Sequence, residues 1–118
     1  MKDLAPSITR QRLLIEATYE KEVNEDNVRE FLAGLCKELE LRVYGDPIIH
    51  SPSGEGKEEN QGFDAFIPLI DSGIALYIWT NKKFLSIVIY TCKEFSEQKA
   101  LDYTRNYFNT IDLESSSF

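Results

Sequence analysis

The sequence predicts an α+β two-layer sandwich, in which two helices pack on one face of an antiparallel sheet. Two observations lead to this fold class. Several segments alternate their side chains with the two-residue period of a strand. Two other segments repeat apolar residues every three or four positions, as amphipathic helices do. The expected order is a strand, a helix, four strands and a second helix.

The length of 118 residues fits one domain, expected to span residues 1–118. We expect residues 1–10 and 112–118 to be flexible, because neither has a sustained period and the second reads as a polar tail. A formal net charge of −7 disfavours nucleic acid and anionic membranes as partners, because their phosphates repel an acidic protein. Since no basic-then-apolar leader or membrane-length apolar run occurs, a cytoplasmic location is expected.

The first part of the chain predicts a strand and the clearest helix. Residues 12–19 have strand composition. Asn24 or Asp26 then caps a helix whose apolar residues recur through residue 39. Cys36 lies on the apolar side of this helix and is expected to be a small buried residue, and two cysteines make no disulfide framework.

An interrupted strand and a polar loop follow this helix. Residues 41–44 begin a strand that Gly45-Asp46-Pro47 interrupts, and residues 48–50 resume it. The single histidine, His50, has no second ligand beside it in the sequence, so we expect no metal site. Residues 51–60 form a loop rich in glycine, serine and charge, which we expect to act as a lid on the next segment.

Residues 61–92 predict three strands joined by two tight turns. The first turn is Asp71-Ser72-Gly73, with Ser72 at its tip. The second turn is residues 80–83, and the β-branched and aromatic run of residues 84–91 predicts a central strand.

Ser96 is the expected N-cap of a second helix, whose aromatic stripe we assign to the core. With both helices on one face, the other face of the sheet keeps apolar residues, among them Phe66, Ile70, Tyr77 and Trp79. That face is therefore either a dimer interface or a ligand floor.

Four short motifs stand at fixed spacing in the central stretch: Gln61-Gly62, Asp71-Ser72-Gly73-Ile74, Tyr77-Ile78-Trp79-Thr80-Asn81 and Thr91-Cys92. Together they resemble the bacterial and archaeal S-adenosylmethionine decarboxylases, which take part in spermidine biosynthesis. The corresponding family motifs are Gln-Gly, Glu-Ser-His-Ile, His-Thr-Trp-Pro-Glu and Thr-Cys. The interval from Ser72 to Cys92 matches without a gap, and the resemblance covers nearly the whole chain.

The resemblance implies a self-cleaving enzyme. In the family, the serine at the position of Ser72 attacks the preceding carbonyl, here that of Asp71, and the second chain then begins with a pyruvoyl group. This group forms a Schiff base with the substrate amine and serves as an electron sink during decarboxylation. The cysteine matching Cys92 donates the proton to the resulting intermediate.

The chain departs from the family at the processing positions. The family has a histidine where Tyr77 stands, a serine where Asp64 stands and a histidine where Gly73 stands; the shorter Asp71 replaces a glutamate. A tyrosine with a pKa near ~10 is a poor base at neutral pH. A carboxylate at Asp64 would repel a tetrahedral oxyanion.

The ligand positions implied by the resemblance are also altered. Glu58 replaces an aromatic residue that stacks on adenine, and Asn81 replaces the glutamate that holds the ribose hydroxyls. Trp79 keeps its place in the motif.

Three functions are compatible with these residues, and the sequence leaves open whether the protein is an enzyme. The first is a divergent family member that stays uncleaved, needs no cofactor, and acts as a ligand-binding or regulatory homologue. Its partners would be a second copy in a homodimer, a small amine or S-adenosylmethionine-like ligand, or an active decarboxylase. The second is a decarboxylase that makes its pyruvoyl group from Ser72 and acts on S-adenosylmethionine or another amino acid. The third is a dimeric interaction module, in which Ser72 is a turn serine and Cys92 a buried thiol.

Overall fold

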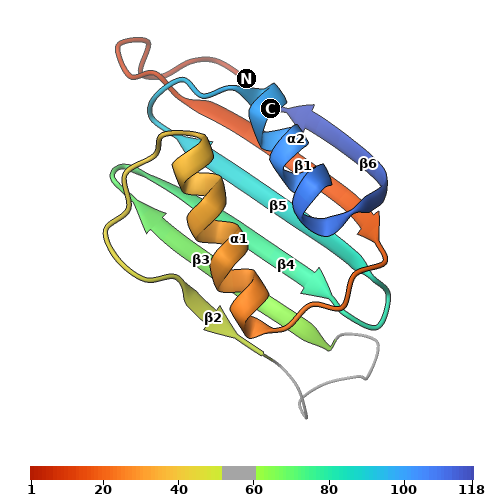
Figure 1. Cartoon of the computed structure of the whole chain (residues 1–118). Coiled ribbons are helices and arrows are strands. Elements are labelled where there is room, and N and C mark those ends of the chain that lie inside the picture. Colours follow the sequence, from red (N-terminus) through yellow and green to blue (C-terminus); the bar gives the residue numbers. More distant parts are fainter. Residues whose placement is uncertain (52–60) are drawn as a thin grey trace.

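The computed structural model describes residues 1–51 and 61–118, and these form one antiparallel sheet with two helices on one face (Figure 1). The predicted α+β two-layer sandwich is therefore confirmed. Six strands of the described chain follow the order β2-β3-β4-β5-β1-β6 across the sheet. The elements are β1 (Gln11–Tyr19), α1 (Glu25–Glu38), β2 (Ile48–His50), β3 (Gly62–Leu69), β4 (Ser72–Trp79), β5 (Phe84–Thr91), α2 (Glu97–Phe108) and β6 (Thr110–Ser117).

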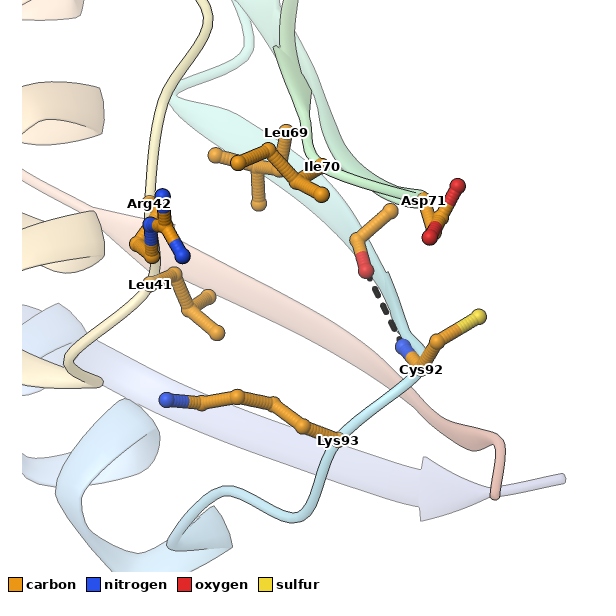
Figure 2. Close-up of a pocket in the computed structure, with 8 residues that line it drawn as sticks. Leu41, Arg42, Leu69, Ile70, Asp71, Cys92 and Lys93 are labelled. Atoms are coloured by element: carbon orange, nitrogen blue, oxygen red, sulfur yellow. Dashed lines mark hydrogen bonds between the residues drawn. The ribbon is translucent and has the colours of Figure 1, made fainter. Parts of the chain in front are cut away.

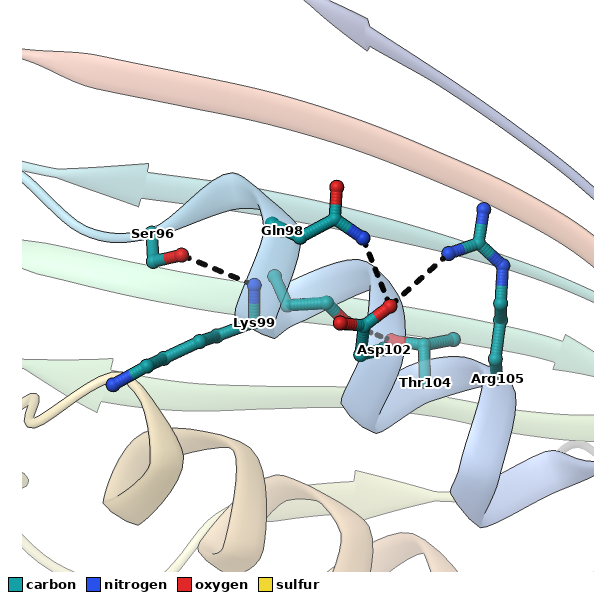
Figure 3. A network of polar contacts seen from close by, with 7 residues as sticks. Ser96, Gln98, Lys99, Asp102, Thr104 and Arg105 are labelled. Atoms are coloured by element: carbon teal, nitrogen blue, oxygen red, sulfur yellow. Dashed lines mark hydrogen bonds and ion pairs between the residues drawn. The ribbon is translucent and has the colours of Figure 1, made fainter.

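Both helices begin at the kind of cap that the sequence predicts. Of the two candidates for α1, Asn24 is the cap: its side chain accepts from the Asn27 N–H at 2.9 Å, and the Asn27 side chain accepts from the Asn24 N–H at 3.0 Å. Ser96 caps α2 by accepting from the Lys99 N–H at 3.1 Å (Figure 3). These contacts satisfy backbone donors that have no partner within the helix.

The core lies between the helices and the sheet. Alternate residues of the central strands face the helices and are fully buried, as Ile74 and Leu76 on β4 and Ile87 and Ile89 on β5 illustrate. Phe31 of α1 meets Phe108 of α2 with ring centroids 4.7 Å apart. The apolar periodicities of the sequence therefore point to this one layer.

The C-terminal segment differs from its prediction. Residues 112–118 do not form a polar tail: Thr110–Ser117 is strand β6, which pairs antiparallel with β1. Asn109 ends α2 in the left-handed conformation, with φ 53°, and the chain returns along the sheet edge. An edge strand is held by backbone hydrogen bonds, so its side chains need no apolar period.

Two local predictions were also imprecise. Residues 41–44 contribute one bridge, Val43 with Leu69, and no strand. Ser72 is not at the hairpin tip: it is the first residue of β4 and pairs with Leu69, so the turn is Ile70-Asp71, with Asp71 at φ 54°. Aspartate tolerates this left-handed conformation better than most residues.

The polar loop predicted as a lid lies, apart from Ser51, outside the described residues, and so does Glu58. In the part of the chain that is described, neither helix is both long and apolar enough to cross a membrane.

The sheet face without helices is called the open face below. It carries the alternate side chains of the strands, including Phe66, Tyr77 and Tyr90, which are 42%, 39% and 40% exposed. The predicted apolar character of this face is confirmed for these residues. Ile70 is also exposed but lies in the turn.

Candidate functional site

Ser72 and Cys92 lie beside each other. The Cys92 backbone N–H donates a hydrogen bond of 3.0 Å to the Ser72 Oγ (Figure 2). The pairing of β4 with β5 explains this contact: Gly73 lies opposite Tyr90, so the start of β4 meets the residues that follow β5. Two residues far apart in the sequence thus meet at one edge of the central hairpin.

The segment that carries Cys92 is held in place by further hydrogen bonds. Buried Thr91 donates from its hydroxyl to the Lys93 carbonyl at 2.6 Å. The Gln11 side chain donates to the Phe95 carbonyl at 2.9 Å and accepts from the Phe95 N–H at 3.0 Å. Gln11 directly precedes the strand predicted over residues 12–19, and this position carries no signal for a contact 84 residues away.

Two hollows meet at Ser72. A cavity of about 250 Å³, called the carboxy-end cavity because it lies at the ends of α1 and β5, is lined by Leu41, Arg42, Leu69, Ile70, Asp71, Ser72, Cys92 and Lys93. A second hollow of about 380 Å³ on the open face is lined by Phe66, Asp71, Ser72, Gly73, Ala75, Val88 and Tyr90. Asp71 and Ser72 line both, so a ligand in either hollow can reach the Asp71-Ser72 bond.

Tyr77 and Asp64 lie together but away from Ser72. They are opposite each other on β4 and β3. Tyr77 is five residues from Ser72, which is about 17 Å along a strand. Because the offset is odd, the two side chains also point to opposite faces of the sheet. Within one copy of the chain, neither Tyr77 nor Asp64 can exchange a proton with the Ser72 hydroxyl.

The described candidate ligand positions lie at the far end of β4. Trp79 is the last residue of that strand, and its ring stacks at an angle on Phe84 with centroids 5.3 Å apart. Asn81 lies in the turn that follows. Trp79 is seven positions from Ser72, which is about 23 Å along the strand. Within one copy, the candidate positions therefore form two separate groups.

Gly73, which replaces a histidine of the family motif, is covered by an aromatic ring. A Cβ atom built on Gly73 would lie 2.6 Å from the Cζ atom of Phe66. Any side chain at this position must therefore displace the Phe66 ring. Glycine at position 73 therefore leaves room for the Phe66 ring, which a histidine at this position would displace.

The other thiol, Cys36, lies apart from this site. It is 3% exposed on the inner side of α1, and burial raises its pKa to about 11. The prediction that Cys36 is a small buried residue is confirmed. Cys92 is partly exposed beside Ser72, which leaves it as the thiol that a ligand can reach.

Comparisons with known proteins agree with this fold. No curated protein sequence matches the chain. Among solved structures, the crystal structure of the adenosylmethionine decarboxylase from Aquifex aeolicus VF5 is similar, with a TM-score of 0.70 and 19% identity over 94% of this chain and 89% of that one. Residues 14–118 match the family model described as S-adenosylmethionine decarboxylase. This match includes the hairpin, Ser72 and Cys92, and the chain therefore belongs to the S-adenosylmethionine decarboxylase family.

Proposed function

We propose that this protein is a non-catalytic member of its family, one that keeps its Asp71-Ser72 peptide bond and acts as a ligand-binding or regulatory homologue. The observation that carries the proposal is the environment of the Ser72 hydroxyl. Its hydrogen bond with the described residues comes from the Cys92 N–H, which is a donor. A serine becomes a nucleophile when an acceptor removes its proton, and an N–H cannot do so.

The residues that would help processing support the same conclusion. Tyr77 offers a poor base at neutral pH, and Asp64 puts a carboxylate where the family has a serine. Both lie about 17 Å along the strand from Ser72 in the same copy. The residue types at these two positions support an uncleaved chain.

The ligand-binding part of the proposal rests on the two hollows at Ser72. Their volumes of about 250 and 380 Å³ suit a small molecule better than a whole nucleoside cofactor. A small molecule that carries an amine, such as an amino acid, is one chemical class that suits such a site.

The open face supports a regulatory role. Phe66, Tyr77 and Tyr90 leave an apolar surface on this face, and Phe66 and Tyr90 line the hollow beside the Asp71-Ser72 bond. An apolar sheet face of this kind favours pairing with another sheet, either of a second copy in a homodimer or of an active decarboxylase. Sedimentation of the chain alone and mixed with an active relative would measure both associations.

A self-cleaving pyruvoyl-dependent decarboxylase is the second candidate, and one observation favours it. The thiol-bearing residue Cys92 lies next to Ser72, where a proton donor would be required. A pyruvoyl group at Ser72 would supply the electron sink for decarboxylation. The site thus fits the group once formed, but among the described residues no base contacts the Ser72 hydroxyl to form it.

The mass of the intact chain under denaturing conditions separates the two candidates. We expect a single full-length species in freshly purified protein, with the Ser72→Ala variant as the matched control. Two fragments that divide between Asp71 and Ser72, absent from the Ser72→Ala variant, would replace the proposed function with the enzyme.

A further inference from the structure

The carboxy-end cavity is positively charged in an acidic protein. The chain has a formal net charge of −7, yet this cavity is lined by Arg42 and Lys93 and by one acid, Asp71. In Figure 2, Arg42 and Lys93 direct their head groups to the same side of the cavity, with Leu41 between them, and the Asp71 carboxylate points away. The charge that a ligand meets on that side is therefore cationic.

The wall that carries Arg42 is fixed to the hairpin. The Ile70 N–H donates to the Arg42 carbonyl at 3.3 Å, and the Tyr44 N–H donates to the Pro68 carbonyl at 3.3 Å. Val43 and Leu69 form a bridge between these two contacts. The backbone of Arg42 therefore has a set position relative to Asp71 and Ser72, and its exposed side chain extends from this fixed point.

Lys93 reaches the same side of the cavity from the segment that follows β5 (Figure 2). Its ammonium donates to the Glu40 carbonyl at 2.7 Å, just beyond the end of α1. One of its three N–H donors is thereby used, and two remain for a ligand. The contact holds the ammonium beside the cavity, where the lysine side chain remains exposed to solvent.

Arg42 keeps its donors available. The ion pairs among the described residues involve neither Arg42 nor Lys93 nor Asp71. No side-chain hydrogen bond of Arg42 occurs among those residues either. A guanidinium offers five N–H donors in a planar fork that matches a carboxylate.

We propose that the carboxy-end cavity selects a small acidic amino acid, whose side-chain carboxylate binds Arg42 and Lys93. This inference rests on the proposed ligand-binding function and names its ligand class. The cavity of about 250 Å³ is below the usual ~300–1,000 Å³ of drug-sized sites, which suits an amino acid. The sulfonium of S-adenosylmethionine would be repelled by the same two cations.

The apolar wall strengthens this preference. Leu41, Leu69 and Ile70 line the cavity beside the two cations. They offer apolar contact to the hydrocarbon part of such a ligand, while Arg42 and Lys93 themselves stay exposed to solvent. The charge, the size and the apolar wall all favour the same ligand class.

Calorimetric titration of the full chain with L-glutamate and L-glutamine tests the proposal, because the two probes have nearly the same shape and differ in one carboxylate. We expect glutamate to bind at least about tenfold more tightly. Arg42→Gln should abolish that difference, and Arg42→Lys should restore part of it, since a lysine keeps the charge and loses the fork.

Arg105→Gln is the matched control, because Arg105 is an exposed arginine on α2 that pairs with Asp102 at 3.3 Å (Figure 3) and does not line the cavity. It should leave the glutamate affinity unchanged. Equal affinities for the two probes, no binding of either, tighter binding of S-adenosylmethionine, or an Arg42→Gln variant that binds like the parent would each overturn the proposal.

The mass measurement separates this inference from the function on which it rests. A cleaved chain that still prefers glutamate refutes the uncleaved, non-catalytic role and leaves the ligand class in place. An intact chain without that preference refutes the ligand class alone.

Discussion

The Cys92 backbone N–H and the Ser72 Oγ are 3.0 Å apart, and this contact ties the residue after β5 to the first residue of β4. It places a thiol and a hydroxyl at the boundary between two hollows. The Cys92 N–H occupies one acceptor position of the Ser72 hydroxyl, and a hydrogen bond from a donor does not make that hydroxyl more nucleophilic. The same contact thus brings the two motif residues together and, among the described residues, leaves the hydroxyl without a base.

Ser72→Ala removes the acceptor of the Cys92 N–H. We expect a loss of about 1 kcal/mol in the free energy of unfolding, because a partly buried donor loses its partner. Urea denaturation measures the loss, and amide hydrogen exchange should be faster at Cys92. Ser86→Ala is the control, since Ser86 donates to Glu16 at an exposed position of the open face. Unchanged exchange at Cys92 would show that the contact is absent in solution.

Gly73→Ala tests the packing of Phe66 over the turn. The added methyl must move the Phe66 ring, whose Cζ would otherwise lie 2.6 Å away. We expect a coupling of about 0.5–1.5 kcal/mol between Gly73→Ala and Phe66→Leu in a double-mutant cycle, with the smaller side chain relieving the clash. Strictly additive changes in the free energy of unfolding would contradict this arrangement.

Gly34→Ala should destabilise the protein although alanine favours helices. Its Cβ would lie 1.8 Å from the Tyr103 hydroxyl oxygen, where α1 meets α2. We expect a net loss of about 1–3 kcal/mol in thermal or urea unfolding, because overpacking outweighs the gain in helix propensity. Adding Tyr103→Ala should make the alanine at position 34 harmless.

Gly45→Ala is the matched control for Gly34→Ala. No atom lies within 4 Å of the Cβ that it would add. We expect no loss of stability and a gain of up to about 1 kcal/mol from the less flexible unfolded chain. Equal destabilisation by both substitutions would mean that the contact with Tyr103 is not the cause.

The two cysteines should differ in reactivity. Cys36 is buried with a raised pKa of about 11, whereas Cys92 is partly exposed. A thiol reagent at mildly alkaline pH should modify Cys92 in the native chain and both cysteines in urea. Cys92→Ser should abolish the native reaction. Rapid modification of Cys36 in the native Cys92→Ser variant would contradict its burial.

Stability should decrease at alkaline pH because of Cys36. Burial raises its pKa in the folded chain to about 11 from 9.0, so the unfolded chain loses this proton first. Below pH 9 both states are protonated and the contribution is fully present; it is lost as the pH rises from 9 through about 11. The urea midpoint measures the decline.

Cys36→Ala should flatten this decline between about pH 9 and 10. Above that range Tyr19 acts in the same direction, because burial and the nearby Glu22 raise its pKa from 10.0 to about 12. An undiminished decline in the Cys36→Ala variant would assign the effect to other groups.

The local sequence predicted those parts of the fold whose cause is local. Strand composition identified β1 and β5, and apolar periods identified α1 and α2. Short polar side chains narrowed the cap of α1 to Asn24 or Asp26 and identified Ser96 as the cap of α2. Strand β6 was not predicted, because an edge strand is stabilised by backbone pairing and residues 112–117 show no apolar period.

Only the residues of the candidate site that belong to a family motif could be predicted from the sequence. The matched spacing from Ser72 to Cys92 indicated their proximity, and the register of β4 with β5 produces it. Nothing in the sequence placed Arg42 and Lys93 on one cavity, because that depends on how the ends of α1 and β5 approach the hairpin.

By itself, the sequence determined the two-layer architecture, the hairpin and the residue types that remain at its end, since these depend on side-chain period, turn chemistry and motif. Only the tertiary structure decided that Tyr77 and Asp64 lie a strand's length from Ser72, and that Gly73 lies beneath Phe66. The physical reason is that strand register and packing set distances between residues, whereas a sequence specifies only their order.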